Sequence, residues 1–204
     1  MLKETYLELL SYYTKNNSLV NELWLEIEQK YSEKKRHYHN LQHLENLLQQ
    51  LIEVKDKIQN WNIILFTLFY HDSIYNSLKT NNEEKSADLA EKRMKQLGIY
   101  INEIELCKEQ ILATKSHQLS TNNDTNLFTD ADLSILGQPW EIYIKYLKDV
   151  RKEYDFYPTI VYKLGRKNVI KHFLEMKPLF KTKFFFDKFE SQAQKNLLKE
   201  LSTL

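Results

Sequence analysis

Glycine and proline are scarce in this chain: three of each occur in 204 residues. Sandwiches and barrels of β-strands need these residues often, because glycine supplies positive φ angles at tight turns and proline ends or bends helices. The chain is therefore predicted to be all-α. Its length is sufficient for one domain with a sizeable core. We expect a single domain over residues 1–204, with a core at about 24–157 and C-terminal helices at about 158–204 packed on it.

Charge and cysteine content argue against several classes of protein. The chain has 29 Lys and Arg against 28 Asp and Glu, a formal net charge of +1, which is not typical of a nucleic-acid coat protein or a polybasic membrane anchor. The single cysteine, Cys107, cannot form an internal disulfide and fits a reducing compartment. No signal peptide is visible, and the densest apolar run, Ile63–Tyr70, is too short to span a bilayer. We therefore expect a cytoplasmic protein without membrane association.

Hydrophobic residues recur at helical spacing along most of the chain. The pattern predicts a helix from His39 to Ile52 with an apolar face of leucines. It also predicts a helix from Trp61 to Tyr70 that is apolar nearly all round, and such a helix is typically central and buried. Gly98 is a suitable residue to follow a helix that begins at Glu83. Further helices are expected at 2–14, 18–34, 101–117, 139–151 and after Pro158 and Pro178, with polar loops at 76–82 and 119–126.

Several histidines and acidic residues lie at predicted helix ends. His71 and Asp72 end the most apolar helix, where an ionised carboxylate without a partner would be costly. A bound cation offsets that cost, because imidazole and carboxylate are both metal ligands; a buried Lys or Arg is the alternative partner. His39 and His43 are four apart, so on a helix they lie on one side, just outside the apolar face. Taken alone, such a pair is more typical of surface or capping histidines.

Asp130 and Asp132 directly precede an apolar run, where an ionised carboxylate would likewise need a partner. The ordered set of His39, His71, Asp72 and Asp132 resembles the metal signature of the HD-domain phosphohydrolase superfamily. More specifically, six stretches are similar to a bacterial subfamily of predicted metal-dependent HD phosphohydrolases. An HD dipeptide alone is a weak signal, whereas six blocks in the expected order are a strong one. The blocks, spread over roughly residues 24 to 200, are Arg36–His43, Phe69–Tyr75, Asn82–Ala87, Thr114–His117, Thr129–Gly137 and Val150–Tyr154.

This resemblance implies a single HD-type helical bundle with a divalent metal ion in a central cleft. Its metal ligands would be His39, His71, Asp72 and Asp132. Asp132 is preferred to Asp130, because the superfamily's last ligand is typically followed directly by an apolar helical residue; Asp130 would then cap or orient. The ion would be Mn, Mg, Co, Ni, Fe or Zn. It would lower the pKa of a water and polarise a phosphoryl oxygen, and Asp72 would orient that water unless its role is purely structural.

The implied activity is hydrolysis of a phosphoester or phosphoanhydride in a small-molecule substrate, with nucleotides among the candidates. Arg36 and Arg151 are candidate phosphate donors, because guanidinium forms paired hydrogen bonds with phosphate oxygens; a surface ion pair is the alternative for each. His43 and His117 could serve a second metal or contact phosphate as protonated donors, and neither is assigned as a ligand. Glu83 opens its helix, where capping explains a carboxylate better. The catalytic candidates are thus Asp72, Arg36, Arg151 and His117.

The sequence leaves two other functions open. A di-iron oxygenase also occurs on HD scaffolds and needs more imidazole ligands, for which His43 and His117 are available. The histidines that those enzymes use have no clear match between Asp72 and His117. The other alternative is a non-catalytic helical module, stapled by a metal or held by ordinary Asp–His pairing. Nucleic acid is not an expected partner, and the sequence indicates neither the substrate, nor the metal, nor the oligomeric state.

Overall fold

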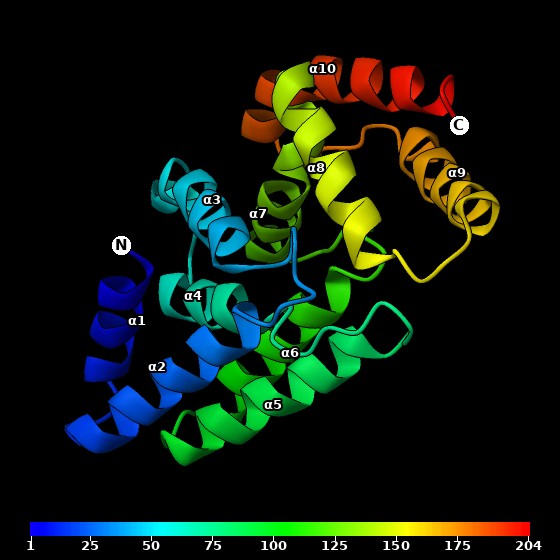
Figure 1. The fold of residues 1–204 in the computed structure, drawn as a ribbon. Coiled ribbons are helices and arrows are strands. Elements are labelled where there is room, and N and C mark those ends of the chain that lie inside the picture. Colours follow the sequence, from blue (N-terminus) through cyan, green and yellow to red (C-terminus); the bar gives the residue numbers. More distant parts are fainter. The chain divides into compact units, whose positions relative to one another are not determined.

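In the computed structural model, which describes residues 1–204, every regular element is a helix, as predicted (Figure 1). The contacts between Cα atoms group the chain into two compact units, Met1–Thr129 and Asp130–Leu204. The division falls within one helix, α7 (Asn123–Asp132), and not near residue 157, where the C-terminal helices were expected to begin. The expectation of a single domain stays a prediction.

The first unit is built around α4, all of whose residues from Ile63 to Tyr70 are buried, as expected. The β-branched and aromatic residues of α4 are modest helix formers, each costing up to about 0.7 kcal/mol relative to alanine. Burial of each large apolar side chain contributes about 1.5–3 kcal/mol, so burial keeps this segment helical. Neither α4 nor any other helix combines the length and apolar character needed to cross a bilayer. The helices that precede α7 are α1 (Leu2–Ser11), α2 (Asn17–Tyr31), α3 (Leu41–Ile52), η1 (Lys55–Lys57), α4 (Trp61–Tyr70), α5 (Asn82–Gln96) and α6 (Ile101–Ala113).

Helix α3 begins two residues later than the sequence suggests. The side chain of Asn40 accepts hydrogen bonds from the backbone N–H groups of Gln42 and His43, and Asn40 therefore caps the helix. His39 lies before this cap, outside the helix. The prediction that His39 and His43 project from one side of a helix is therefore wrong. The apolar face is confirmed by four buried leucines at positions 44, 47, 48 and 51.

Helix α7 was not predicted in full, since it starts inside the stretch 119–126 that was expected to be a polar loop. The carboxylate of Asp124 accepts hydrogen bonds from the backbone N–H groups of Gln59 and Asn60, at 2.9 and 2.8 Å. Asp124 is buried, and its carboxylate holds α7 to the chain just before α4. Gly98 follows α5 with a φ of 73°, which confirms its role at the end of that helix.

The second unit is held together by buried polar contacts as well as by apolar packing. Asp130 is completely buried and accepts hydrogen bonds from the backbone N–H groups of Lys181 and Thr182, so its carboxylate holds the chain just before α10. Its expected capping or orienting role stays a prediction. Arg166 and Glu200 form a buried ion pair of 2.7 Å. The helices that follow α7 are η2 (Leu133–Gly137), α8 (Trp140–Glu153), α9 (Thr159–Glu175) and α10 (Lys183–Leu201).

Candidate metal centre

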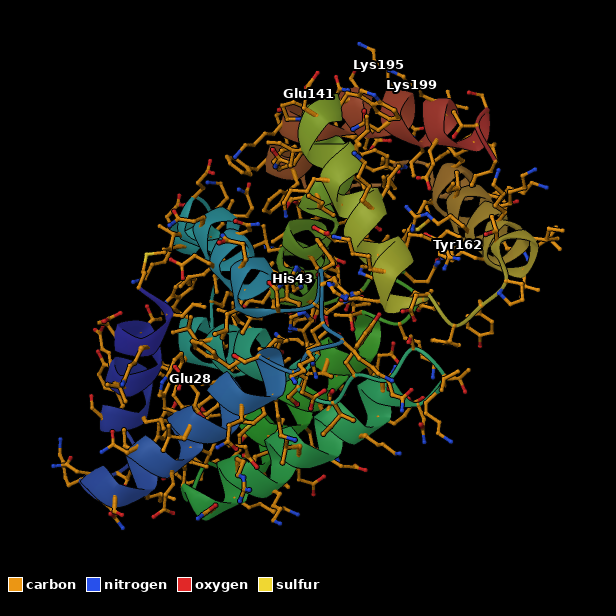
Figure 2. The ribbon with its side chains drawn as sticks, in the orientation of Figure 1. Glu28, His43, Glu141, Tyr162, Lys195 and Lys199 are labelled. Atoms are coloured by element: carbon orange, nitrogen blue, oxygen red, sulfur yellow. The ribbon has the colours of Figure 1, made fainter.

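Two buried histidines of the first unit face each other. His43 lies in the first turn of α3 (Figure 2), and His71 directly follows α4. Their Nε2 atoms are 3.2 Å apart. Oδ2 of the next residue, Asp72, lies 3.2 Å from Nε2 of His71 and 3.8 Å from Nε2 of His43. Three atoms of the kinds that bind metals therefore converge on one point from two segments of the chain.

A hydrogen bond to the backbone sets the protonation of His71. Its Nδ1 lies 2.9 Å from the carbonyl oxygen of Leu68. Because a carbonyl only accepts, Nδ1 carries the proton, and Nε2 of the neutral ring keeps its lone pair. Histidines that bind metals commonly make this second hydrogen bond, which orients the ring. Without a metal, Nε2–H of His43 can donate to this lone pair; with the His43 proton on Nδ1, the two lone pairs face each other and favour a cation.

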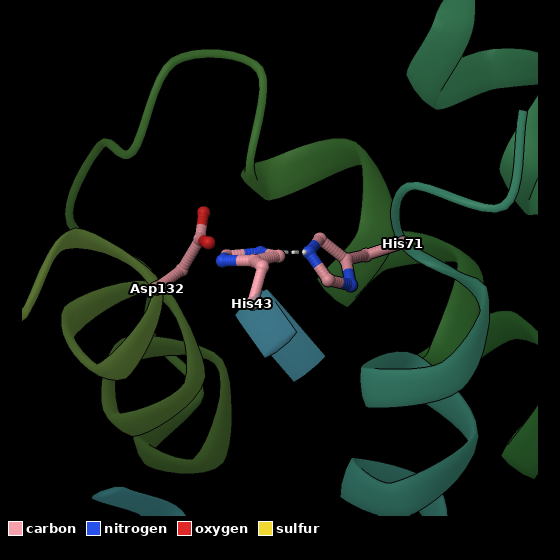
Figure 3. A group of neighbouring side chains, drawn as sticks. All are labelled: His43, His71 and Asp132. Atoms are coloured by element: carbon pink, nitrogen blue, oxygen red, sulfur yellow. Dashed lines mark hydrogen bonds between the residues drawn. The ribbon is translucent and has the colours of Figure 1, made fainter. Parts of the chain in front are cut away.

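Asp132 adds a second carboxylate to this group. It is the last residue of α7, which runs unbroken across the division between the units. One ligand atom from each of His43, His71 and Asp132 lies within 4.8 Å of the others, and Figure 3 shows His43 between the other two side chains. One turn earlier on α7, the ring of Phe128 packs edge-on against His71, with 5.5 Å between ring centroids. The three side chains could hold a metal ion.

His39 lies beside this group. Its ring stacks on Tyr75 at 4.3 Å and is 5.9 Å from the ring of His43, both measured between centroids. Its assignment as a ligand stays a prediction, whereas His43, which the sequence did not assign as a ligand, belongs to the group. The signal that could have identified His43 is Asn40: as an N-cap, it places His43 in the first turn beside the buried leucines.

The electrostatic setting of Asp72 favours its anionic form. Burial by itself raises the pKa of this carboxyl group. When Nε2 of His71 carries a proton in place of a metal ion, its attraction and hydrogen bond, together with the attraction of protonated His39 and His43, outweigh burial and hold the pKa well below its usual range. The side chain remains 19% exposed, so solvent reaches it. The anion is the form that binds cations.

The two candidate phosphate-binding arginines donate to backbone carbonyl groups. The segment between Arg36 and His39 is not helical. The guanidinium of Arg36 donates to the carbonyl oxygens of Asp72 and Ser73, at 2.6 and 3.1 Å. In the second unit, Arg151 donates to the carbonyl oxygen of Tyr154 at 2.6 Å. Phosphate binding by either arginine stays a prediction.

His117 and Glu83 lie at the ends of neighbouring helices. His117 follows α6, is 9% exposed and has a φ of 53°, the left-handed region that residues other than glycine seldom adopt. Its catalytic role stays a prediction. Glu83 lies in the first turn of α5, where the helix dipole favours a carboxylate, and is 4.0 Å from the ammonium group of Lys115.

The start of α5 supports the chain that leaves the histidine site. The hydroxyl of Ser86 accepts a hydrogen bond from the backbone N–H of Ile74 at 3.0 Å and donates to its carbonyl oxygen at 3.3 Å. The side-chain amide of Asn82 binds both backbone groups of Asn76 in the same way, at 3.1 and 3.0 Å. Two residues of the block Asn82–Ala87 therefore support the backbone of the segment that follows His71 and Asp72.

Comparison of the chain with protein-family models, with curated proteins and with solved structures gives no match. Membership of the HD superfamily therefore stays a prediction from the six sequence blocks.

Proposed function

We propose that this protein is a metal-dependent phosphohydrolase of the HD type, which cleaves a phosphoester or phosphoanhydride in a small-molecule substrate. The observation that carries the proposal is the meeting of His43, His71 and Asp72 in the first unit. Their Nε2, Nε2 and Oδ2 atoms are separated by 3.2, 3.2 and 3.8 Å. We further propose that Asp132 and His39 complete the ligand set.

The separations agree with ligands that share one ion. Bonds from a metal to imidazole nitrogen and carboxylate oxygen are about 2.0–2.2 Å long. Ligands at octahedral or tetrahedral angles around one ion are then about 2.8–3.6 Å apart, and a wider angle of about 120° gives about 3.5–3.8 Å. A single hydrogen bond explains one such distance. It does not explain why three acceptor-type atoms surround a common point.

A divalent cation at this point would supply Lewis acidity to a phosphoryl group and would lower the pKa of a nearby water. The residues of the chain would orient the ligands and the water. Leu68 holds the ring of His71 in the tautomer with a free Nε2 lone pair. Asp72, the most solvent-accessible of the three and anionic, is the residue that we assign to orienting the attacking water.

The test begins with protein stripped of metal by a chelator. It is reloaded with Mn²⁺, Mg²⁺, Co²⁺, Ni²⁺, Fe²⁺ or Zn²⁺ and assayed against an aryl phosphate and a panel of nucleotides. We expect turnover with at least one metal and its loss on adding chelator. H43A and H71A should each lose at least about 100-fold in activity, since even residues that only support a metal ligand are worth 10–100-fold. H37A is the matched control, because His37 is exposed and should retain wild-type activity.

Three results would contradict the proposal in different ways. Failure of the wild-type protein to bind any of these metals would remove the site itself. Tight metal binding and metal-dependent stability without turnover of any phosphate compound would favour the non-catalytic module. Two irons per chain with a mixed-valent signal would favour the di-iron oxygenase, for which the three histidines at 39, 43 and 71 supply imidazoles.

A further inference from the structure

Arg36 is buried between the two segments that carry the site. Its side chain is 1% exposed. Nη1 donates to the carbonyl oxygens of His39 at 3.2 Å and Asp72 at 2.6 Å, and Nη2 donates to the carbonyl oxygen of Ser73 at 3.1 Å. One guanidinium therefore joins the loop before α3 to the chain that follows α4.

The charge of Arg36 is stabilised mainly by dipoles and aromatic rings. The guanidinium carbon lies 4.9 Å from the ring centroid of Tyr31 and 5.5 Å from that of Tyr75, distances at which cations attract aromatic faces. Its salt bridge joins Nε to Glu33, which is 55% exposed, at 3.6 Å. Such a pair contributes little in water. Burying a charge is costly. The hydrogen bonds to the three carbonyl groups therefore offset much of the cost of burying the guanidinium.

Two of these three carbonyl groups belong to His39 and Asp72, whose side chains are proposed to hold the metal. Fixing the peptide groups of His39 and Asp72 fixes the directions of their Cα–Cβ bonds. Tyr31 adds to this support, because its hydroxyl accepts a hydrogen bond from the backbone N–H of Asp72 at 3.2 Å. Tyr75 stacks on His39 as well as lying by the guanidinium. Metal sites need their ligands held within about 0.5 Å, and this arrangement provides such support.

We propose that Arg36 is a positioning residue, which sets the geometry of the metal site by clamping the backbone of His39 to that of Asp72 and Ser73. The inference rests on the proposed metal-binding function. It replaces the phosphate-binding role suggested by the sequence. Both N–H groups of Nη1 are committed to carbonyl oxygens, and the side chain is too buried for a substrate to reach.

The test uses Co²⁺ as the probe, because its visible absorption reports the geometry of its ligands. Metal-free wild type, R36M and R36K are titrated with Co²⁺, and circular dichroism establishes that each variant is folded. We expect R36M to bind Co²⁺ about 10–100-fold more weakly with an altered spectrum, as for the loss of other groups that orient metal ligands. R36K should recover only part of the affinity, since an ammonium group cannot reproduce the planar fork.

R93M is the matched control. Arg93 also makes a paired contact in the first unit, donating from Nε and Nη2 to Glu26 at 2.8 and 2.7 Å, but it contacts no residue of the site. R93M should lose stability and still bind Co²⁺ as the wild type does. One result would overturn the inference: R36M binds Co²⁺ within twofold of wild type and with the same spectrum, and inorganic phosphate inhibits its phosphatase activity less than that of the wild type. Arg36 would then bind phosphate, and the proposed metal-binding function would stand. If the wild type binds no Co²⁺, the proposed function fails first.

Discussion

The close approach of η2 to α10 at Gly137 predicts a large effect for a small substitution. A methyl group at position 137 would lie 2.5 Å from Cβ of Phe189, 2.8 Å from its carbonyl oxygen and 2.9 Å from its Cα. Carbon atoms in favourable contact are about 3.5–4.0 Å apart, so G137A creates an overlap of about 1 Å. The overlapping atoms are backbone and Cβ of a helix, which cannot rotate away. The strain must therefore move η2 or α10.

Overpacking of this kind costs about 1–3 kcal/mol, and the rigid neighbours place G137A in the upper half of that range. We expect a loss of about 2–3 kcal/mol in the free energy of unfolding. For a chain of this size each kcal/mol lowers Tm by about 2–4 °C, so the expected decrease is about 4–12 °C.

Thermal and urea denaturation, followed by circular dichroism, would measure this loss. G165A is the matched control, because Gly165 lies inside α9 and a methyl group there has no atom within 4 Å. Replacing a glycine inside a helix by alanine should stabilise the protein by about 0.5–1 kcal/mol. The two substitutions add the same methyl group and should shift stability in opposite directions. A G137A protein as stable as wild type would refute the close packing of η2 on α10.

Two further predictions concern buried groups outside the site. Cys107 is fully buried, which raises the pKa of its thiol to about 12 despite a hydrogen bond from Thr67. Ellman's reagent at pH 8 should therefore label this thiol only in denaturant. Labelling of the native protein would contradict the burial. Because the unfolded thiol ionises at a lower pH than the folded one, the contribution of Cys107 to stability should decline as pH rises from about 9 towards 12, and C107A should remove that part of the pH dependence. Asp130 also accepts hydrogen bonds from Nζ of Lys181 and the hydroxyl of Thr182, at 2.9 and 2.7 Å. D130N leaves the buried ammonium without its counter-charge and should cost about 3–5 kcal/mol in urea denaturation, and a near-neutral D130N would show that this pair is dispensable.

The fold could be predicted from the sequence where burial and periodicity agree. The apolar run of α4 and the leucine face of α3 both show strong local patterns, and both are confirmed. The start of α7 shows the opposite case. Its first residues, Asn123 to Asn126, are weak helix formers that favour turns when taken alone. They are helical because hydrogen bonds to other parts of the chain stabilise them there. Asp124 accepts a hydrogen bond from the backbone just before α4, and Asn126 makes two hydrogen bonds with the backbone of Ser120, at 2.8 and 2.9 Å.

The histidine site was predictable in its location and not in its membership. The adjacent His71 and Asp72 at the end of the most apolar helix indicated the place where the group of His43, His71 and Asp132 lies. The choice between His39 and His43 depended on where α3 begins, because a helix that begins at Leu41 includes His43 and leaves His39 outside it. Spacing alone could not make that choice, since the Asn40 cap and the contact with His71 are what decide it.

Arg36 and Arg151, the two candidate phosphate donors, both hold backbone carbonyl groups. Each guanidinium joins backbone carbonyl groups of separate residues. Arg36 joins those of His39, Asp72 and Ser73, and Arg151 joins those of Tyr154 and Tyr157, at 2.6 and 3.1 Å. Two acceptors of fixed orientation can be bridged by a planar fork with several N–H donors, whereas the single ammonium of lysine reaches them only by giving up linear geometry. The requirement for arginine at both positions therefore follows from the shape of the backbone that it holds.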